Sequence, residues 1–489
     1  MASLEEIRAE RIKKINDLKE KKINPYPVLS TRDFSLAEVA QDFLKLSKRK
    51  KPVHLTGRVM ALRGQGALVF FNIDDGTGVF QGLLKKDEIK EDARKLFVDT
   101  VDIGDFVEIK GSLFTTKRKE KTLLVKDWKM LSKSLRPLPD KWHGLQDVEE
   151  RFRKRYLDTI MSTEVKDRFV LRSKIITEFR KILNDKEYLE VETPILQSLA
   201  GGAIAQPFLT HHNALDIDLN LRIAPELYLK KLLVGGFPKV YEIGRNFRNE
   251  GVDTTHNPEF TMLEFYESYS DAGKQMIFVE SIFKTLVKKI FTGTTILYGE
   301  EKISFSKKFT VVSFLDLLKR YALIANPENI TLDELKLKAK QLGVDVADSD
   351  GLEKVMDNIY KKVCRPKLIQ PTFIVDYPAA FSPFAKRKED NPALIDRFQL
   401  VIGGIEIVNA FSELNDPLDQ RERYVEQDKK KKRGDAEVSP SDEDYLEAME
   451  YGMPPAGGVG IGIDRVVMLF TNTKNIKEVI LFPTMRPKE

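Results

Sequence analysis

Short runs of alternating apolar and polar residues dominate the chain between residues 52 and 134. This two-residue period is typical of half-buried strands, and Asp74-Asp-Gly76 marks a turn between two of them. A helical pattern over residues 87–98 separates the third run from the fourth. The expected strands are 53–63, 68–73, 79–84, 106–113 and 122–131. Five strands with one inserted helix predict an OB-fold barrel, a common binder of single-stranded nucleic acid, with a generic small β-barrel as the alternative.

Long helical patterns mixed with further strands replace this alternation in the rest of the chain. The pattern predicts a helix over residues 165–186, followed by an extended segment over 188–196 whose backbone Pro194 restricts. A mostly helical stretch over 312–365 interrupts the later strands, so we expect it to be an inserted subdomain. The predicted α+β organisation is an N-terminal helix and lead-in (1–51), the OB-fold (52–134), a linker (135–164) and a larger domain with the helical insertion (165–489).

Two strands joined by a tight polar loop are predicted around residues 245–261. Alternation places on one face of the first strand Glu242, Asn246, Arg248 and Glu250. One face of the second strand carries Phe260, Met262, Glu264 and Tyr266. A face that combines an arginine, carboxylates and aromatic rings is costly to bury unless it binds something polar, so this hairpin is a candidate binding site. A solvated hairpin laced with salt bridges is the alternative.

Glycines at alternate positions form a second candidate, Gly457-Gly-Val-Gly-Ile-Gly462. Glycine at every other position of a strand leaves room for a ligand or another backbone to approach closely. The run lies near the C-terminus and outside any β-α-β unit, which argues against a dinucleotide-binding turn. A helix is predicted to begin near Asp464, which would place Arg465 in its first turn, directed out of this glycine floor.

A third candidate is the hairpin predicted around Gly403-Gly404, a pair that suits a two-residue turn. Regular pairing around that turn places Gln399 opposite Val408 and on the same face as Glu406. The other face then carries Asn409, Phe411 and Glu413. Carboxylates in such apolar strands indicate a nearby cation, either a magnesium ion or the amine of a substrate.

Composition narrows the class of protein. The chain has 489 residues, 42% hydrophobic and 32% charged, which suits a globular protein of two or three domains. A net charge of +5 is too small to indicate nucleic acid by itself, although basic residues cluster locally, as at 429–433. The single cysteine excludes an internal disulfide, and five histidines give little support for a zinc site. Because no apolar stretch is long enough to span a membrane, we expect a cytoplasmic protein without a membrane partner.

Several of these segments resemble the class II aminoacyl-tRNA synthetases, and in particular their lysine-specific members. Phe247-Arg-Asn-Glu250 with His256-Asn-Pro-Glu-Phe260 is similar to motif 2 of that class, Gly460-Ile-Gly-Ile-Asp-Arg465 is similar to motif 3, and Val191-Glu-Thr-Pro194 carries the proline of motif 1. The lysine-specific features are Gly201-Gly-Ala203, His211-His-Asn-Ala-Leu215, Arg222-Ile-Ala-Pro-Glu-Leu-Tyr-Leu-Lys230, Phe411-Ser-Glu-Leu-Asn-Asp416 and Phe482-Pro-Thr-Met-Arg-Pro487. The resemblance covers nearly the whole chain and implies an antiparallel-sheet catalytic domain after the OB-fold.

The resemblance implies ATP-dependent ligation of L-lysine to tRNA(Lys) through a lysyl-adenylate, in a homodimer formed through motif 1. Arg248 and Arg465 would be catalytic, because guanidinium groups can neutralise the lysine carboxylate and the ATP phosphates. The residues implied for ATP are Arg248, Glu250, His256, Asn257, Phe260, Met262 and Arg465. Those implied for lysine are Gly202, Glu226, Arg248, Glu264, Tyr266, Asn409, Phe411 and Glu413. Glu406 and Glu413 would hold Mg²⁺, and Arg63, Phe70 and Gln81 would bind the anticodon, with Phe70 as ordinary barrel core the alternative.

Two positions depart from the family pattern. Gln399 stands where the family usually has a glutamate that pairs with Glu406 to hold magnesium, which leaves the number of ions open. Ala67 stands where a Gly-Lys pair is usual after Gly66. Regular alternation also separates Glu406 from Glu413, so a β-bulge would be needed for both to reach one site.

Three other functions stay open at this point. An aspartate or asparagine ligase would share the OB-fold and the motifs. A lysyltransferase that modifies a protein is a second alternative, against which the barrel predicted over residues 52–134 argues. A non-catalytic RNA-binding paralogue is the third.

Overall fold

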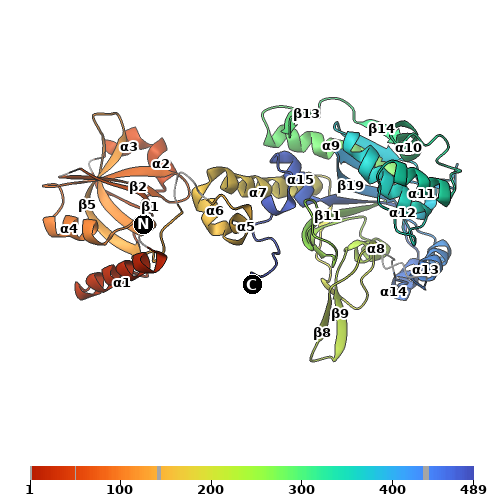
Figure 1. Cartoon of the computed structure of the whole chain (residues 1–489), viewed down its shortest axis with the longest axis horizontal. Coiled ribbons are helices and arrows are strands. Elements are labelled where there is room, and N and C mark those ends of the chain that lie inside the picture. The colour runs from red at the N-terminus through yellow and green to blue at the C-terminus, as the bar shows by residue number, and fades with distance from the viewer. Residues whose placement is uncertain (1–2, 50, 66, 140–144, 433–439, 489) are drawn as a thin grey trace. The chain divides into compact units, whose positions relative to one another are not determined.

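The computed structural model describes residues 3–49, 51–65, 67–139, 145–432 and 440–488. It divides into two compact units, Met1–Leu145 and Gln146–Glu489 (Figure 1). No helix in the described ranges is both long and apolar enough to cross a membrane. Gly66, part of the linker and the last residue of the basic run 429–433 lie outside the described residues, as do the side chains of 430–432.

The first unit is a closed barrel of five strands with a helix between its third and fourth strands. Its elements are α1 (Leu4–Glu20), α2 (Leu36–Gln41), α3 (Phe43–Ser47), β1 (Val53–Gln65), β2 (Leu68–Asp74), β3 (Val79–Lys85), α4 (Glu91–Thr100), β4 (Phe106–Thr115) and β5 (Lys121–Ser132). Burial alternates along β2, so Val69, Phe71 and Ile73 point into the barrel. Phe97 of α4 packs between Phe71 and Trp128, with ring centroids 4.9 and 5.1 Å away. The strand order β1-β2-β3-β5-β4 confirms the predicted OB-fold.

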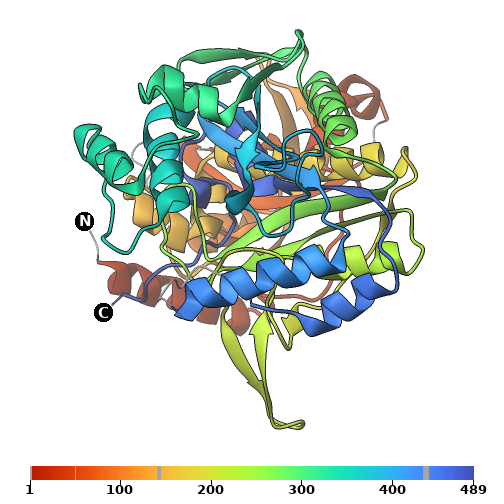
Figure 2. The same cartoon turned by 90° about the vertical axis from the view of Figure 1, so that its right-hand side faces the viewer.

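An eight-stranded sheet forms the centre of the second unit (Figure 2). In spatial order its strands are β14 (Thr310–Ser313), β15 (Thr372–Val375), β18 (Arg397–Ile402), β19 (Ile405–Ser412), β20 (Ala456–Gly462), β11 (Glu259–Ser268), β10 (Lys239–Phe247) and β6 (Leu189–Glu190). Only the two edge pairs, β14 with β15 and β6 with β10, are parallel. The sheet is therefore the predicted antiparallel one, and it brings the three candidate segments side by side at its centre.

Helices cover one face of this sheet and leave the other face for polar groups. α7 (Thr163–Asn184), α9 (Ala272–Ile290) and α15 (Ile463–Phe470) share a hydrophobic core with the central strands. Leu263, Val408 and Ile461 are buried in that core. Because side chains alternate along a strand, their neighbours such as Met262 and Gly460 face the opposite side, where the candidate residues gather.

The predicted helical insertion lies between β14 and β15. It consists of α10 (Phe314–Tyr321), α11 (Leu332–Gln341) and α12 (Leu352–Ile359), followed by a π-helical turn (Tyr360–Cys364) and a 3₁₀ turn (Arg365–Lys367). Phe314 contacts the rings of Tyr360 and Tyr377, at centroid distances of 5.2 and 4.7 Å. These aromatic contacts attach the insertion to the segment that precedes β18.

A small sheet in the order β7 (Leu196–Gln197), β9 (Ile217–Leu221) and β8 (Leu209–His212) precedes α8 (Glu226–Val234). The β8–β9 hairpin projects from the second unit in both views (Figures 1 and 2). The remaining elements are α5 (Val148–Arg153), α6 (Arg155–Met161), β12 (Thr295–Tyr298), β13 (Glu301–Ser304), β16 (Tyr377–Pro378), β17 (Leu394–Ile395), α13 (Pro417–Lys432) and α14 (Glu443–Glu450).

The β18–β19 hairpin departs from the predicted register. Its two-glycine turn lies where it was expected, with positive φ at both glycines. However, the pairing shifts at Ile407, an extra residue that forms a β-bulge in β19. Gln399 therefore lies opposite Asn409, and the prediction that it faces Val408 is wrong. The bulge turns Ile407 and Val408 both into the core and leaves Glu406 and Asn409 on the open side of the sheet.

Candidate active site

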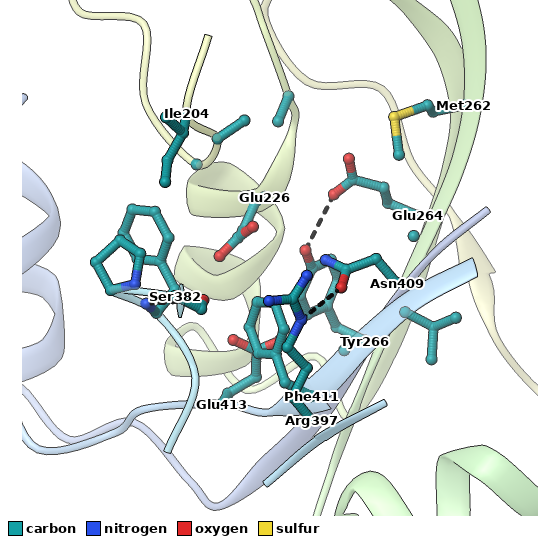
Figure 3. A pocket seen from close by; sticks show the side chains of 18 of the residues that line it. Ile204, Glu226, Met262, Glu264, Tyr266, Ser382, Arg397, Asn409, Phe411 and Glu413 are labelled. Carbon is teal, nitrogen blue, oxygen red and sulfur yellow. Dashed lines mark hydrogen bonds between the residues drawn. The ribbon is translucent and has the colours of Figure 1, made fainter. Parts of the chain in front are cut away.

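Two cavities meet on the open face of the sheet. The first, which we name the acidic cavity, is lined by the carboxylates of Glu226, Glu264 and Glu413 (Figure 3). The second, the arginine cavity, is lined by Arg248 and Arg465. Four residues line both cavities: Arg248, Met262, Asn409 and Gly460.

The structure brings the predicted substrate residues together in these two places. Lining the acidic cavity are all the residues predicted for lysine: Gly202, Glu226, Arg248, Glu264, Tyr266, Asn409, Phe411 and Glu413. Lining the arginine cavity are all those predicted for ATP: Arg248, Glu250, His256, Asn257, Phe260, Met262 and Arg465. Glu406 lines the arginine cavity, whereas Glu413 lines the acidic one.

The glycine strand β20 forms the floor between the strands that carry these side chains. Gly458 pairs with Tyr266 on one side and with Phe411 on the other. A Cβ atom at Gly458 would collide with the Glu413 carboxylate and with the Tyr266 ring. Glycine is required at this position because two functional side chains cross the floor there.

A buried arginine, Arg222, stabilises the hairpin that carries motif 2. Arg222 is fully buried, forms an ion pair with Glu242 and donates from Nε to the carbonyl oxygen of Arg245 at 2.9 Å. Glu242 also accepts a hydrogen bond from Thr193 Oγ1 at 2.7 Å, which ties the motif 1 segment to the same strand. These buried contacts rule out the alternative of a solvated hairpin.

The sequence analysis placed Lys230 at the end of a lysine-specific segment but gave it no role, and the structure places it beneath the acidic cavity. Its side chain is fully buried and forms ion pairs with Glu226 and Glu413. Its ammonium also lies 5.1 and 5.3 Å from the ring centroids of Phe384 and Phe411. Burial alone would lower the pKa of Lys230, but the two carboxylates outweigh burial and raise it. The i, i+4 spacing of Glu226 and Lys230 on α8 is the sequence signal that could have identified this pair.

The surroundings of Glu264 favour its neutral form. Burial, together with the negative charge of Glu226, raises the pKa of Glu264 to about 8. The hydroxyl of Tyr266 donates to Glu264 Oε2 at 3.0 Å (Figure 3). Burial also raises the pKa of Glu413, whose Oε2 pairs with Lys230 and whose buried Oε1 has no hydrogen-bond partner among the described residues.

The charges of the acidic cavity suit a ligand with two cationic groups. Glu226, Glu264 and Glu413 supply three carboxylates, of which Lys230 neutralises one, and Arg248 and Arg397 also line the cavity and supply positive charge for an anionic group of the ligand. An uncompensated buried carboxylate is costly, so the cavity favours a ligand that brings two ammonium groups. An amino acid with an ammonium on its side chain has that charge pattern.

Both predicted catalytic arginines line the arginine cavity, and neighbouring residues contact each of them. Arg248 lies over the ring of Phe260, 5.0 Å from its centroid, and its buried Nε has no hydrogen-bond partner in the described structure. Arg465 stands in the first turn of α15, as predicted, and donates from Nη1 to the carbonyl oxygen of Glu406 at 3.0 Å. Asp464 secures the start of that helix by accepting the backbone N–H of Thr261 at 2.7 Å.

Arg397 is a residue that the sequence analysis missed. It lines the acidic cavity and donates from Nε to Asn409 Oδ1 at 2.8 Å (Figure 3). Its guanidinium also lies over the ring of Tyr377. Arg397 lies two residues from Gln399 on β18, so strand alternation from that candidate position could have identified it.

The predicted anticodon residues share the outer face of the barrel. Arg63 pairs with Phe70 across β1 and β2, and Gln81 pairs with Asn72 across β2 and β3. Phe70 is only partly buried, whereas Phe71 beside it lies in the barrel core. The alternative of Phe70 as ordinary barrel core is therefore wrong.

Comparisons with known proteins identify the domain in each unit and relatives of the whole chain. The family model described as tRNA synthetases class II (D, K and N) matches residues 147–486, and that of the OB-fold nucleic acid binding domain matches residues 53–131. The lysine–tRNA ligase of Pelotomaculum thermopropionicum is 48% identical over 488 residues, which cover 99% of this chain and 96% of that protein. The lysine–tRNA ligase of Carboxydothermus hydrogenoformans is 46% identical over 99% of both chains. That of Aquifex aeolicus is 49% identical over 90% of this chain and 74% of its own length.

Proposed function

This chain belongs to the lysine–tRNA ligases among the class II tRNA synthetases, and from that membership we propose how its residues divide the reaction. The enzyme ligates L-lysine to tRNA(Lys) in two steps. The lysine carboxylate attacks the α-phosphorus of ATP and displaces pyrophosphate, and a terminal ribose hydroxyl of the tRNA then takes the lysyl group and releases AMP. Because the carboxylate is already ionised at neutral pH, the first step needs charge neutralisation and positioning rather than a general base.

The observation that carries this division is the position of Arg248, which lines both cavities. We assign lysine to the acidic cavity, with Glu226 near its α-ammonium and with Glu413 and Tyr266 near its side-chain ammonium. Arg248 would then contact the lysine carboxylate and the α-phosphate together, because a guanidinium offers a fork of donors. This assignment places the two reacting anions on either side of one cation.

ATP is assigned to the arginine cavity. Phe260 would stack on the adenine, and Arg465 would neutralise the phosphates from the other end. Glu250, His256, Asn257 and Met262 complete the proposed ATP contacts, and each lines this cavity.

We propose that Mg²⁺ accompanies ATP and that Glu406 is the protein carboxylate that holds it. Magnesium is commonly bound through one or two carboxylates together with substrate phosphates and water, so the carboxylate of Glu406, which lines the arginine cavity, fits such an ion. When bound, the ion would neutralise phosphate charge. Glu413 lies in the other cavity and pairs with Lys230, so its geometry favours the ammonium of lysine over the predicted second role as a metal ligand.

The barrel is proposed to bind the anticodon of tRNA(Lys) with Arg63, Phe70 and Gln81. Phe70 offers a partly exposed ring on which a base can stack, and Arg63 lies directly beside it on the neighbouring strand. Because tRNA is charged where proteins are made, we also propose that the enzyme acts in the cytoplasm.

A homodimer is proposed through the segment around motif 1. Apolar side chains are exposed there, among them Leu196 (48%), Leu209 (78%) and Leu215 (64%). Clustered exposed apolar residues are typical of an interface with another chain. Light scattering should report a dimer that Leu196→Asp dissociates, and a wild-type monomer would refute this proposal.

Amino-acid-dependent exchange of pyrophosphate into ATP, measured with all twenty amino acids, tests the function. Lysine should support exchange, because the acidic cavity offers carboxylates for two ammonium groups. Exchange that depends on aspartate or asparagine would refute the assignment of the amino acid. No exchange with any amino acid would favour the non-catalytic alternative, whereas the barrel continues to argue against a protein-modifying lysyltransferase.

A further inference from the structure

Arg465 is oriented in the arginine cavity by two neutral hydrogen-bond acceptors. Its Nη1 donates to the carbonyl oxygen of Glu406 at 3.0 Å, and its Nη2 lies 3.1 Å from Nε2 of His256. The carboxylate of Glu406 lies 4.0 Å from Nη1, which is beyond hydrogen-bond distance. Neutral acceptors fix the direction of a guanidinium and add no negative charge beside it, so its charge stays available for an anionic ligand.

Two further carboxylates line the same cavity, those of Glu250 and Asp464. Asp464 is engaged elsewhere, because its Oδ1 accepts a hydrogen bond from Arg172 at 2.5 Å. Within the described part of the chain, neither of these carboxylates forms an ion pair with Arg465, and Glu250 accepts no hydrogen bond from it. The two neutral acceptors therefore determine where the remaining N–H groups of this guanidinium point.

The contact between His256 and Arg465 requires one particular tautomer of the imidazole. A guanidinium can only donate, so Nε2 must be the acceptor and the ring proton must lie on Nδ1. Asp253 Oδ2 lies 2.8 Å from Nδ1, and a carboxylate can only accept that proton. The hydroxyl of Thr255 lies 3.1 Å from the same Nδ1 but donates its own proton to Asp253 Oδ1, at 3.0 Å. Asp253 is thus the group that selects the tautomer.

The two oxygens of Asp253 have separate partners, which fixes how its carboxylate lies. Oδ1 accepts the backbone N–H groups of Thr255 and His256, at 2.6 and 2.8 Å, whereas Oδ2 faces the imidazole. The loop between β10 and β11 that carries these residues is itself tied down, because the carbonyl oxygen of Thr254 accepts the backbone N–H of Ile476 at 2.7 Å. An asparagine at position 253 would keep its oxygen on the backbone N–H groups and turn its NH₂ group towards Nδ1.

We propose that Asp253 is a positioning residue for the ATP phosphates: it holds the proton of His256 on Nδ1, so that Nε2 accepts from Arg465 and orients that guanidinium. The inference rests on the proposed assignment of ATP to the arginine cavity. A guanidinium that is already oriented loses less freedom when it binds a phosphate, so it stabilises the complex more than a mobile one. The imidazole also stands between the carboxylate of Asp253 and Arg465, so the negative charge of Asp253 does not contact the cation.

The tautomer can be observed directly, without measuring activity. NMR correlations between ring protons and nitrogens in protein labelled with ¹⁵N-histidine distinguish a protonated ring nitrogen from an unprotonated one, and His256→Gln identifies the signal among the five histidines of the chain. At pH 9 the wild type should carry the proton on Nδ1 of His256. Asp253→Asn should carry it on Nε2, because the NH₂ group would donate to Nδ1. A wild-type proton on Nε2, or a tautomer that Asp253→Asn leaves unchanged, would overturn the proposal.

Lysine-dependent pyrophosphate exchange measures the consequence for ATP. Asp253→Asn should raise the KM for ATP by about tenfold or more, the usual effect of losing a hydrogen bond to a charged group, and leave the KM for lysine unchanged. Asp218→Asn is the matched control and should behave as the wild type, because Asp218 Oδ1 lies 2.9 Å from Nδ1 of His211 in the β8–β9 hairpin and lines neither cavity.

Equal KM values for ATP in the two variants would overturn the proposal. Should Asp253→Asn fail to fold, Asp253→Ser should raise the same KM, because its hydroxyl can accept from the backbone of the loop but is too short to hold the imidazole proton as well. A wild type without lysine-dependent exchange would refute the proposed function instead.

Discussion

Replacing Lys230 by methionine removes the buried cation that lies beneath the acidic cavity. The variant keeps a side chain of similar length but leaves Glu226 and Glu413 as buried carboxylates without a partner. Removing one partner of a buried ion pair typically costs about 3–5 kcal/mol in the free energy of unfolding. Because Lys230 serves two carboxylates and is fully buried, we expect the loss to lie in this range at pH 9.

The loss should depend on pH in a defined direction. Burial already raises the pKa values of Glu226 and Glu413, and removal of Lys230 takes away the attraction that opposes burial. A carboxyl group whose pKa is raised on folding stabilises the folded state at low pH, and that stability is lost as the pH rises through the folded pKa. The deficit of Lys230→Met should therefore grow from pH 6 to pH 9, by up to about 1.4 kcal/mol per pH unit for each carboxyl that titrates.

Urea unfolding of the wild type and the variant at pH 6, 7.5 and 9 measures this deficit. Lys231→Met is the matched control, because Lys231 follows on the same helix, is only partly buried and lies over the ring of Tyr228. The control should lose about 1 kcal/mol or less, independently of pH. If Lys230→Met loses no more than the control, or loses the same amount at every pH, the account of the acidic cavity is wrong.

Three further predictions test the substrate assignments. Arg248→Ala should abolish lysine-dependent pyrophosphate exchange without changing the urea midpoint, because the cation common to both substrates is gone, and retained exchange would contradict the motif 2 assignment. The dissociation constant of lysine should rise by up to about tenfold per pH unit below pH 8, since the pKa of Glu264 is about 8 and its ionised form is needed to bind an ammonium group. Calorimetry between pH 6 and 9 measures this dependence, which Glu264→Gln should lack. A dissociation constant that does not change with pH in the wild type would refute the prediction. Phe70→Ala should weaken tRNA binding by about 1–3 kcal/mol and leave pyrophosphate exchange intact, whereas Phe71→Ala, one residue along β2, should instead cost the barrel about 3–5 kcal/mol of stability.

The two-residue periodicity of the sequence was sufficient to predict those strands of which one face is buried in the core. Along β11, alternation correctly placed Phe260, Met262, Glu264 and Tyr266 on one side, because the other side must enter the core. The OB-fold was predictable for the same reason, since the barrel interior fixes every second residue of β2.

Two features could not be read from local patterns. The bulge at Ile407 breaks the period of two, and a run of apolar residues gives no sign of which one is extra. The burial of Lys230 was missed because a lysine four residues after a glutamate on a helix usually forms a solvated pair, and only the packing of α8 against β10, β11 and α14 buries it. The predicted roles of individual residues came from the resemblance to a family, because the spacing of residues along the chain indicates which side chains lie close together but not which ligand they bind.

The wall common to the two cavities limits how the enzyme can be redesigned. Tyr266, Phe411 and Glu413 line only the cavity to which we assign the amino acid, so exchanging them should alter the choice of amino acid while leaving the proposed nucleotide contacts in place. Arg248, Met262, Asn409 and Gly460 line both cavities, so a change at any of these four should disturb both proposed ligands at once. An engineered enzyme for a larger lysine analogue should therefore start from the first group and keep the second unchanged.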